Sequence, residues 1–254
     1  MRAASASCLA ISRRVLLLQP AARVLAPRAI AAVVPGVTSR IASPLLLTTR
    51  RGMKVYTKTG DKGTSTLFSG ERRPKNDDAF QALGDTDELN AQIGVAIEQS
   101  RLVQNEYLPE KLESIQSRLF DLGACLATPL TTASQFKKNR TGTFDDANVS
   151  QLESWIDEMD LELPPLKCFI LPSGGGLAST HLHVARAVCR RAERRVVPLV
   201  GAGDVEPVVQ RYLNRLSDFL FVAARYSALK EGKEETKWQN QNIKPSKELK
   251  SDDE

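Results

Sequence analysis

The stretch RAVCRRAERR, Arg186 to Arg195, decides the fold of this chain. Arg186, Arg190 and Arg194 are spaced by four, so they predict a row of guanidinium groups along one face of a helix. Like charges at this spacing repel, and guanidinium groups stay protonated, so the row favours an anionic partner. On a neighbouring face, apolar residues recur every three or four positions and predict a buried seam: Leu182, Ala185, Cys189, Ala192, Val196 and Leu199.

Four more helical patterns flank this one. We expect helices at about residues 85–102, 109–127, 147–160, 177–199 and 206–230. Asp85 or Thr86 would cap the first helix and Gly232 the last. Residues 54–73 read as an ordered loop with short extended pieces and residues 131–145 as a polar, mobile loop. Helices of this length with short connections predict an all-α protein, a five-helix up-and-down bundle.

The first 52 residues differ from the rest in composition. They contain eight arginines, no lysine and no acidic residue, which is typical of a mitochondrial transit peptide and predicts the matrix as destination. A secretory signal is disfavoured because the apolar run 15–18 is short. Without this segment, 27 Lys and Arg face 30 Asp and Glu, so the net charge gives no reason to expect nucleic-acid binding. No later stretch is long and apolar enough to span a membrane.

The chain therefore divides into three expected parts: a transit peptide at 1–52, a helical bundle at 53–232 and a disordered polar tail at 233–254. Cys125, Cys168 and Cys189 are far apart and form no zinc pattern. His181 and His183 cannot share a helix face, so we expect structural roles and no metal site. No arrangement of Ser, His and Asp predicts a nucleophile.

The loop TKTGDKGTST, residues 57–66, alternates glycines, hydroxyls and lysines. Its glycines allow backbone N–H groups to converge on an anion, which suits a polyphosphate. It is not a Walker A loop, because no Gly-Lys-Ser/Thr ends it. A flexible polar arm is the alternative, and composition alone does not decide between them.

The arginine row also has two interpretations. It could be a solvated face paired with acidic neighbours, as charge runs usually are. Alternatively, polar groups of the first and last helices could hold the arginines around a ligand. These groups are Asp85, Asp87, Glu88, Asn214, Asp218 and Arg225. The glycines at 174–176, before the helix, could present N–H groups to an anion or form a plain turn.

Six segments, in this order, resemble the ATP:cob(I)alamin adenosyltransferases of the propanediol-utilisation type. They are TKTGDKGTST, SGERRPKND, GDTDELNAQIG, FILPSGG, RAVCRRAERR and YLNRLSDFLF. The resemblance covers residues 54–232 and implies a homotrimer with active sites between subunits. It implies transfer of the 5′-deoxyadenosyl group of ATP to cob(I)alamin, with release of triphosphate and use of Mg²⁺.

The resemblance also implies roles for single residues. Asp87 would pair with Arg190 across the subunit boundary, Arg190 and Arg194 would bind the leaving triphosphate, and Phe169 would lie under the corrin and displace the lower axial ligand. ATP would be held by Thr57, Lys58, Thr59, Gly60, Ser65, Thr66, Lys75, Arg190, Arg191, Ala192, Glu193, Arg194 and Asn214. No protein metal ligands are expected.

This activity implies two further partners, a cobalamin reductase that supplies the reduced substrate and an adenosylcobalamin-dependent mutase that uses the product. A protein of this kind could instead act mainly as a cobalamin carrier or chaperone that hands cofactor to the mutase. A generic ATP-binding bundle is a third hypothesis, and it predicts ATP affinity without any effect of a corrinoid.

Overall fold

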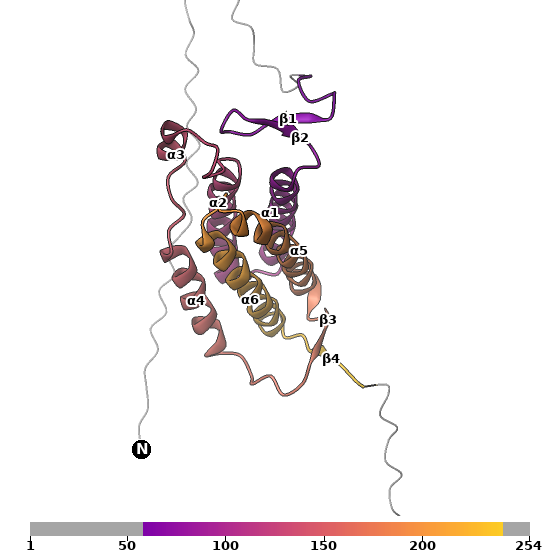
Figure 1. The fold of residues 1–254 in the computed structure, drawn as a ribbon. Helices are drawn as coiled ribbons and strands as arrows, with labels where there is room; N and C mark the ends of the chain where they lie inside the picture. The colour runs from indigo at the N-terminus through magenta and orange to yellow at the C-terminus, as the bar shows by residue number, and fades with distance from the viewer. Residues whose placement is uncertain (1–57, 241–254) are drawn as a thin grey trace, which may run out of the picture. The chain divides into compact units, whose positions relative to one another are not determined.

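Six helices and four short strands make up residues 58–240, the part of the chain that the computed structural model describes (Figure 1). The predicted transit peptide lies outside these residues. The helices are α1 Asp78–Leu102, α2 Tyr107–Leu126, α3 Gln135–Thr141, α4 Ala147–Asp160, α5 Gly176–Gly201 and α6 Pro207–Lys230. The strands are β1 Thr64–Thr66, β2 Arg72–Pro74, β3 Ile170–Gly174 and β4 Glu235–Lys237.

The five longer helices coincide with the predicted ones, but α1 begins earlier than expected. Its N-cap is Asp77, whose side chain accepts a hydrogen bond from the N–H of Ala79 at 3.0 Å, so the predicted caps Asp85 and Thr86 lie inside the helix. Ala79 and Ala82 are buried and extend the apolar seam of α1 towards its N-terminus. Small residues at these positions gave a weak hydrophobic signal in the sequence.

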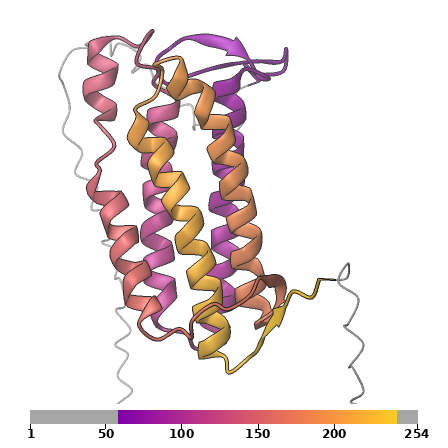
Figure 2. The ribbon, with the colours of Figure 1, turned by 60° about the horizontal axis from the view of Figure 1, so that its bottom comes forward.

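The core forms where α5 packs between α1 and α6 (Figure 2). α1 also packs against α2, and α4 packs against α6. All six residues of the predicted α5 seam are buried: Leu182, Ala185, Cys189, Ala192, Val196 and Leu199. Full burial of each large apolar side chain contributes roughly 1.5–3 kcal/mol, so this seam fixes which face of α5 turns inward.

Three expectations require correction. The chain is mostly helical rather than all-α, because β1 pairs with β2 and β3 pairs with β4 in two small antiparallel sheets. The polar segment 131–145 contains the short helix α3, which Ser134 caps by accepting from the N–H of Lys137. The predicted disordered tail begins too early, since β4 lies within it.

The two sheets lie at opposite ends of the helices (Figures 1 and 2). β1 and β2 lie near the start of α1, and β3 leads directly into α5. Among the described residues, no helix is long and apolar enough to cross a membrane.

Candidate functional site

A tight hairpin forms the first part of the candidate site. β1 and β2 pair antiparallel, with Ser65 opposite Arg73. The guanidinium group of Arg72 donates to the carbonyl oxygen of Thr59 at 2.7 Å and to the hydroxyl of Thr64 at 2.9 Å. Arg72 therefore holds the glycine-rich loop against β2.

Lys75 lies against Gly60 in this hairpin. A Cβ atom at Gly60 would lie 3.1 Å from Nζ of Lys75, so the flexible end of the lysine side chain reaches the backbone of the loop at this glycine. The N–H of Lys75 also donates to the carbonyl of Gly63 at 2.9 Å. The predicted binding residues of the loop thus gather around one turn: Lys58, Thr59 and Thr66 are exposed and Ser65 is half-buried, while Thr57 lies outside the described residues.

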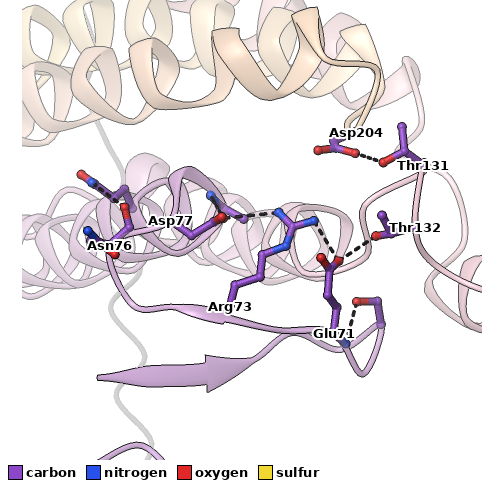
Figure 3. A network of polar contacts seen from close by, with 10 residues as sticks. Glu71, Arg73, Asn76, Asp77, Thr131, Thr132 and Asp204 are labelled. Carbon is purple, nitrogen blue, oxygen red and sulfur yellow. Dashed lines mark hydrogen bonds and ion pairs between the residues drawn. The ribbon is translucent and has the colours of Figure 1, made fainter. Parts of the chain in front are cut away.

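A charged network fastens the hairpin to the helices (Figure 3). Arg73 donates to Glu71 at 2.8 Å and to Asp77 at 3.3 Å, and the hydroxyl of Thr132 donates to the same Glu71 oxygen at 2.8 Å. These hydrogen bonds, that from Arg73 first, hold the pKa of Glu71 below its usual value. Glu71, Arg72 and Arg73 all stand in the SGERRPKND motif, but neither their spacing nor their composition predicts these contacts.

The arginines of α5 divide into two groups. Arg191 and Arg195 turn towards α1, where Nε of Arg191 donates to Asp85 at 3.3 Å and Nε of Arg195 lies 3.6 Å from the same carboxylate. Arg191 also pairs with Glu88. These two arginines are therefore neutralised within the chain, as the solvated-face interpretation predicted.

Arg190 and Arg194 stay exposed on the outer face of α5. Arg194 donates to the carbonyl oxygen of Arg190 at 2.9 Å, and neither side chain forms an ion pair within residues 58–240. Arg186, one turn earlier, is half-buried, and its Nε has no hydrogen-bond partner in the described part of the chain. Burial, and secondarily Arg190, lower the pKa of Arg186. This face therefore carries positive charge that residues 58–240 do not compensate. Ala192, by contrast, is buried in the apolar seam of α5.

Glu193 and Asn214 come together beside the arginines. The amide nitrogen of Asn214 donates to Glu193 at 2.9 Å, between α6 and α5. Both line an open pocket of about 470 Å³ that also contains Glu153 and Arg215, which pair at 2.9 Å. Arg215 was not singled out from the sequence; it pairs with Asp218 on its own helix, but Glu153, the partner that joins it to α4, lies on another helix.

Asp87 lies on a different side of α1 from the arginine contacts. It is exposed and lines a pocket of about 370 Å³ between α1 and α2, with Phe120. Asp85 and Glu88, by contrast, face α5. Within the described residues, no ion pair joins Asp87 to Arg190.

Phe169 lies at the other end of the molecule, just before β3. Its side chain is 77% exposed, and its ring meets that of Trp238 edge-on with centroids 6.1 Å apart. At 1.5 Å of rise per residue, α5 alone extends about 39 Å between this end and the hairpin end. Phe169 and the hairpin of one chain are therefore too distant to touch one small ligand. The predicted face around Asn214, Asp218 and Arg225 is also divided: Asp218 pairs with Arg215, and Arg225 with Glu235.

The described residues contain no group of three or more His, Cys, Asp or Glu side chains that could hold a metal ion. A Mg²⁺ ion that accompanies a nucleotide needs no such group, because phosphate oxygens and water supply most of its ligands. The residues present therefore fit a Mg²⁺ ion only where a bound polyphosphate supplies its ligands.

Known proteins are similar to this chain over most of the residues that the structure describes. Residues 55–227 match the model of a family described as cobalamin adenosyltransferase. The chain is 53% identical to the corrinoid adenosyltransferase MMAB of Homo sapiens over 189 residues, which cover 74% of each chain. It is 46% identical over 174 residues to a corrinoid adenosyltransferase of Bacillus subtilis, covering 68% of this chain and 86% of the relative.

Solved structures show the same similarity. One is a variant of a PduO-type ATP:corrinoid adenosyltransferase from Lactobacillus reuteri, complexed with cobalamin and ATP. It has 35% sequence identity and a TM-score of 0.66, over 74% of this chain and all of that one. A second variant of that protein, complexed with ATP, has 34% identity and a TM-score of 0.64, over 73% of this chain and all of the other.

Proposed function

The chain belongs to the cobalamin adenosyltransferase family, and we propose that it transfers the 5′-deoxyadenosyl group of ATP to cob(I)alamin, giving adenosylcobalamin and triphosphate. Cob(I)alamin is the nucleophile: its cobalt forms a bond to C5′ while the C5′–O bond breaks and triphosphate leaves with the electron pair. The protein therefore needs no Ser, Cys or His nucleophile. Its tasks are to orient C5′ towards cobalt and to stabilise charge on the leaving group.

The single observation that carries the nucleotide site is the uncompensated charge on α5. Arg190 and Arg194 form no ion pair within residues 58–240, whereas their neighbour Arg191 does. Triphosphate would supply the missing anion, and each charge-assisted hydrogen bond contributes roughly 1.5–3 kcal/mol. The hairpin would complete the site with Lys75, the turn N–H groups and the hydroxyls of Thr59 and Ser65.

The geometry also supports a site shared between copies of the chain. Asp87 lies on the α2 side of α1, so a pair with Arg190 requires a second copy. Phe169 directly precedes β3, which lies at the opposite end of the helices from the hairpin (Figure 2), so one site that uses both also requires two chains. We infer that the five longer helices form a bundle, that three copies assemble, and that Asp87 and Arg190 pair across each boundary.

The corrin would bind at the Phe169 end. Phe169 is exposed, and so are Leu171 and Leu177, which follow it closely in the chain. These side chains would offer apolar surface to the lower face of the corrin. An apolar ring there would exclude water and the axial base from cobalt and so favour the four-coordinate form, which is easier to reduce.

In the cell, the proposed reaction would involve Mg²⁺, the mitochondrial matrix and two partner enzymes. Mg²⁺ would bind ATP through its phosphates and neutralise part of their charge. The arginine-rich composition of residues 1–52 supports import into the mitochondrial matrix. A cobalamin reductase would supply the substrate there, and a mutase would consume the product.

The direct test mixes the protein with ATP, Mg²⁺ and chemically reduced cobalamin and follows the absorbance spectrum. We expect the spectrum of adenosylcobalamin to appear together with stoichiometric triphosphate. A protein that binds ATP but yields neither product would contradict the proposed activity and favour a generic ATP-binding bundle.

Subunit complementation tests the shared site. Lys75→Ala and Arg190→Ala should each lose most of their activity alone, because one damages the hairpin and the other damages α5. After the two are unfolded together and refolded at equal amounts, about a quarter of the sites should pair an intact hairpin of one chain with an intact α5 of the next. Activity near zero in the mixture would place both groups in the same chain's site.

A further inference from the structure

The chain after α6 forms a small two-stranded sheet with β3. β4 pairs with β3 antiparallel, with Ile170 opposite Lys237 and Gly174 opposite Glu235. Beyond β4, the N–H of Trp238 donates to the carbonyl oxygen of Phe169 at 2.8 Å. Within the segment 233–238, residues 234–238 are therefore hydrogen-bonded along β3 and its two flanking residues, Phe169 and Gly175.

A buried ion pair fixes this segment from the inside. The side chain of Arg225 on α6 is only 7% exposed, and its Nε lies 3.1 Å from Glu235. Its NH2 group donates to the carbonyl oxygen of Pro164 at 2.9 Å. Since an arginine is almost never buried without partners, Arg225 ties together α6, β4 and the loop that leads to Phe169.

Two glycines of β3 and α5 show how closely the segment packs. A Cβ atom at Gly174, whose φ is +88°, would lie 2.7 Å from the hydroxyl of Thr236 and 2.9 Å from the carbonyl oxygen of Glu234. The N–H of Gly175 donates to that same carbonyl at 3.2 Å. The N–H of Gly175 is therefore engaged by the tail and does not serve as an anion donor.

At the end of the segment, Trp238 meets Phe169. The ring centroids are 6.1 Å apart and the ring planes are inclined by 86°, an edge-to-face arrangement. Phe169 is 77% exposed and Trp238 is 47% exposed, so Trp238 supports one side of Phe169 and leaves the other side open. An exposed aromatic ring without such a neighbour would sample several rotamers.

We propose that residues 233–238 belong to the corrin site and that Trp238 is a positioning residue, which fixes the orientation of the Phe169 ring under the corrin. This inference rests on the proposed function, because it assumes that Phe169 meets the corrin. Trp238 does not itself touch the reacting atoms. It acts by reducing the number of Phe169 orientations that compete with the one that excludes the lower axial ligand.

The test compares full-length variants bound to ATP and cob(II)alamin. Trp238→Ala removes the supporting ring, and Trp238→Phe retains an aromatic edge. Phe136→Ala is the matched control, because Phe136 is also exposed, at 69%, but lies on α3 at a distance from this strand pair. The main readout is the fraction of four-coordinate cob(II)alamin, measured by absorbance and electron paramagnetic resonance.

We expect Trp238→Ala to lower the ratio of four-coordinate to five-coordinate cob(II)alamin by about 2- to 10-fold, the factor that an aromatic pair typically supplies. The KM for cob(I)alamin should rise, the affinity for ATP and the unfolding temperature should stay near wild type, and Trp238→Phe should restore most of the effect. Phe136→Ala should match wild type in all of these.

Three other outcomes have distinct meanings. Wild-type coordination in Trp238→Ala would overturn the positioning role. A loss of ATP binding and of thermal stability in that variant would also overturn it, because Trp238 would then be a general structural residue. Failure of the wild-type protein to form adenosylcobalamin would refute the proposed function itself, which the wild-type arm alone decides.

Discussion

The two sheets at the ends of the helices are stabilised by different kinds of interaction. The β1–β2 hairpin is held by partly exposed charges, Arg73 with Glu71 and Asp77, and by Arg72 on the loop. The β3–β4 pair is held by a buried arginine, close glycine contacts and an aromatic pair. The hairpin end suits a ligand rich in negative charge, and the β3–β4 end suits a large apolar ring. The difference is consistent with the proposed function, in which each end would contribute to the binding of one of the two substrates.

The largest effect should come from filling the space between β3 and β4. Gly174→Ala combines a left-handed backbone with a clash against backbone atoms, and we expect a loss of about 2–5 kcal/mol of stability or detachment of β4. Gly63→Ala is the matched control at the hairpin end. Gly63 also has positive φ, +75°, but no atom lies within 4 Å of an added Cβ, so only the strain of about 1–2 kcal/mol remains.

Chemical denaturation of both variants, with hydrogen exchange at residues 233–238, measures this contrast. Equal destabilisation by the two substitutions would show that the close packing of β4 adds nothing to stability. It would also remove the structural basis for including the tail in the corrin site.

As the pH falls, the protein should first lose the stability that depends on His183 in α5, and only at lower pH the stability of the hairpin network. His183, two turns into α5, is buried, and its ring lies tilted against that of Phe221 with centroids 6.0 Å apart. Its Nδ1 has no hydrogen-bond partner among the described residues. Burial first, and then the charge of Arg186, lower its pKa from 6.5 to about 4. The folded state therefore binds fewer protons than the unfolded state, and stability present above pH 6.5 is lost as the pH falls towards 4.

The shift corresponds to at most about 3 kcal/mol. Urea unfolding from pH 7.5 to pH 4.5 should show this loss in the wild-type protein, and His183→Gln should show a smaller slope over the same range. An identical slope in the variant would mean that other groups cause the acid sensitivity.

Removal of one guanidinium group from the outer face of α5 should affect catalysis and leave folding intact. Arg190→Ala should lower kcat/KM by roughly 10- to 150-fold, since one charge-assisted hydrogen bond contributes about 1.5–3 kcal/mol. The unfolding temperature should hardly change, because Arg190 forms no ion pair in the described chain. Arg118→Ala, an exposed arginine on α2, is the control and should keep full activity. Normal activity of Arg190→Ala would exclude a role in triphosphate binding.

The sequence predicted what depends on local periodicity and composition. The buried seam of α5 and all five longer helices were predicted, because apolar spacing directly encodes which helix face is buried. The start of α1 was wrong by about two turns, because Ala79 and Ala82 bury small side chains that give little signal.

Long-range contacts were harder to predict. The strand β4 lies in a polar segment, and its stability comes from Arg225, ten residues away, and from β3, which lies more than sixty residues earlier. The division of the arginine row into paired and unpaired members could not be predicted either. The packing of α5 decides which arginine meets α1. The predicted site residues lie in four places in one chain: the hairpin, the α5 face with Asn214, the side of α1 that carries Asp87, and the end that carries Phe169. Their shared role stays a prediction for the assembled protein.

The smallest effect should come from the hairpin network. Glu71 is more than a third exposed, so its bonds to Arg73 and Thr132 together should contribute at most about 1 kcal/mol. Its pKa is lowered from 4.5, chiefly by the hydrogen bond from Arg73, so this stability is present above pH 4.5 and is lost as the pH falls below it. Glu71→Gln and Thr132→Ala, alone and combined, should give a coupling free energy of a few tenths of a kcal/mol, measured by urea unfolding at pH 7. A coupling as large as the cost of Gly174→Ala would show that the hairpin is held as firmly as β4, and the contrast between the two ends would then lie in their chemistry alone.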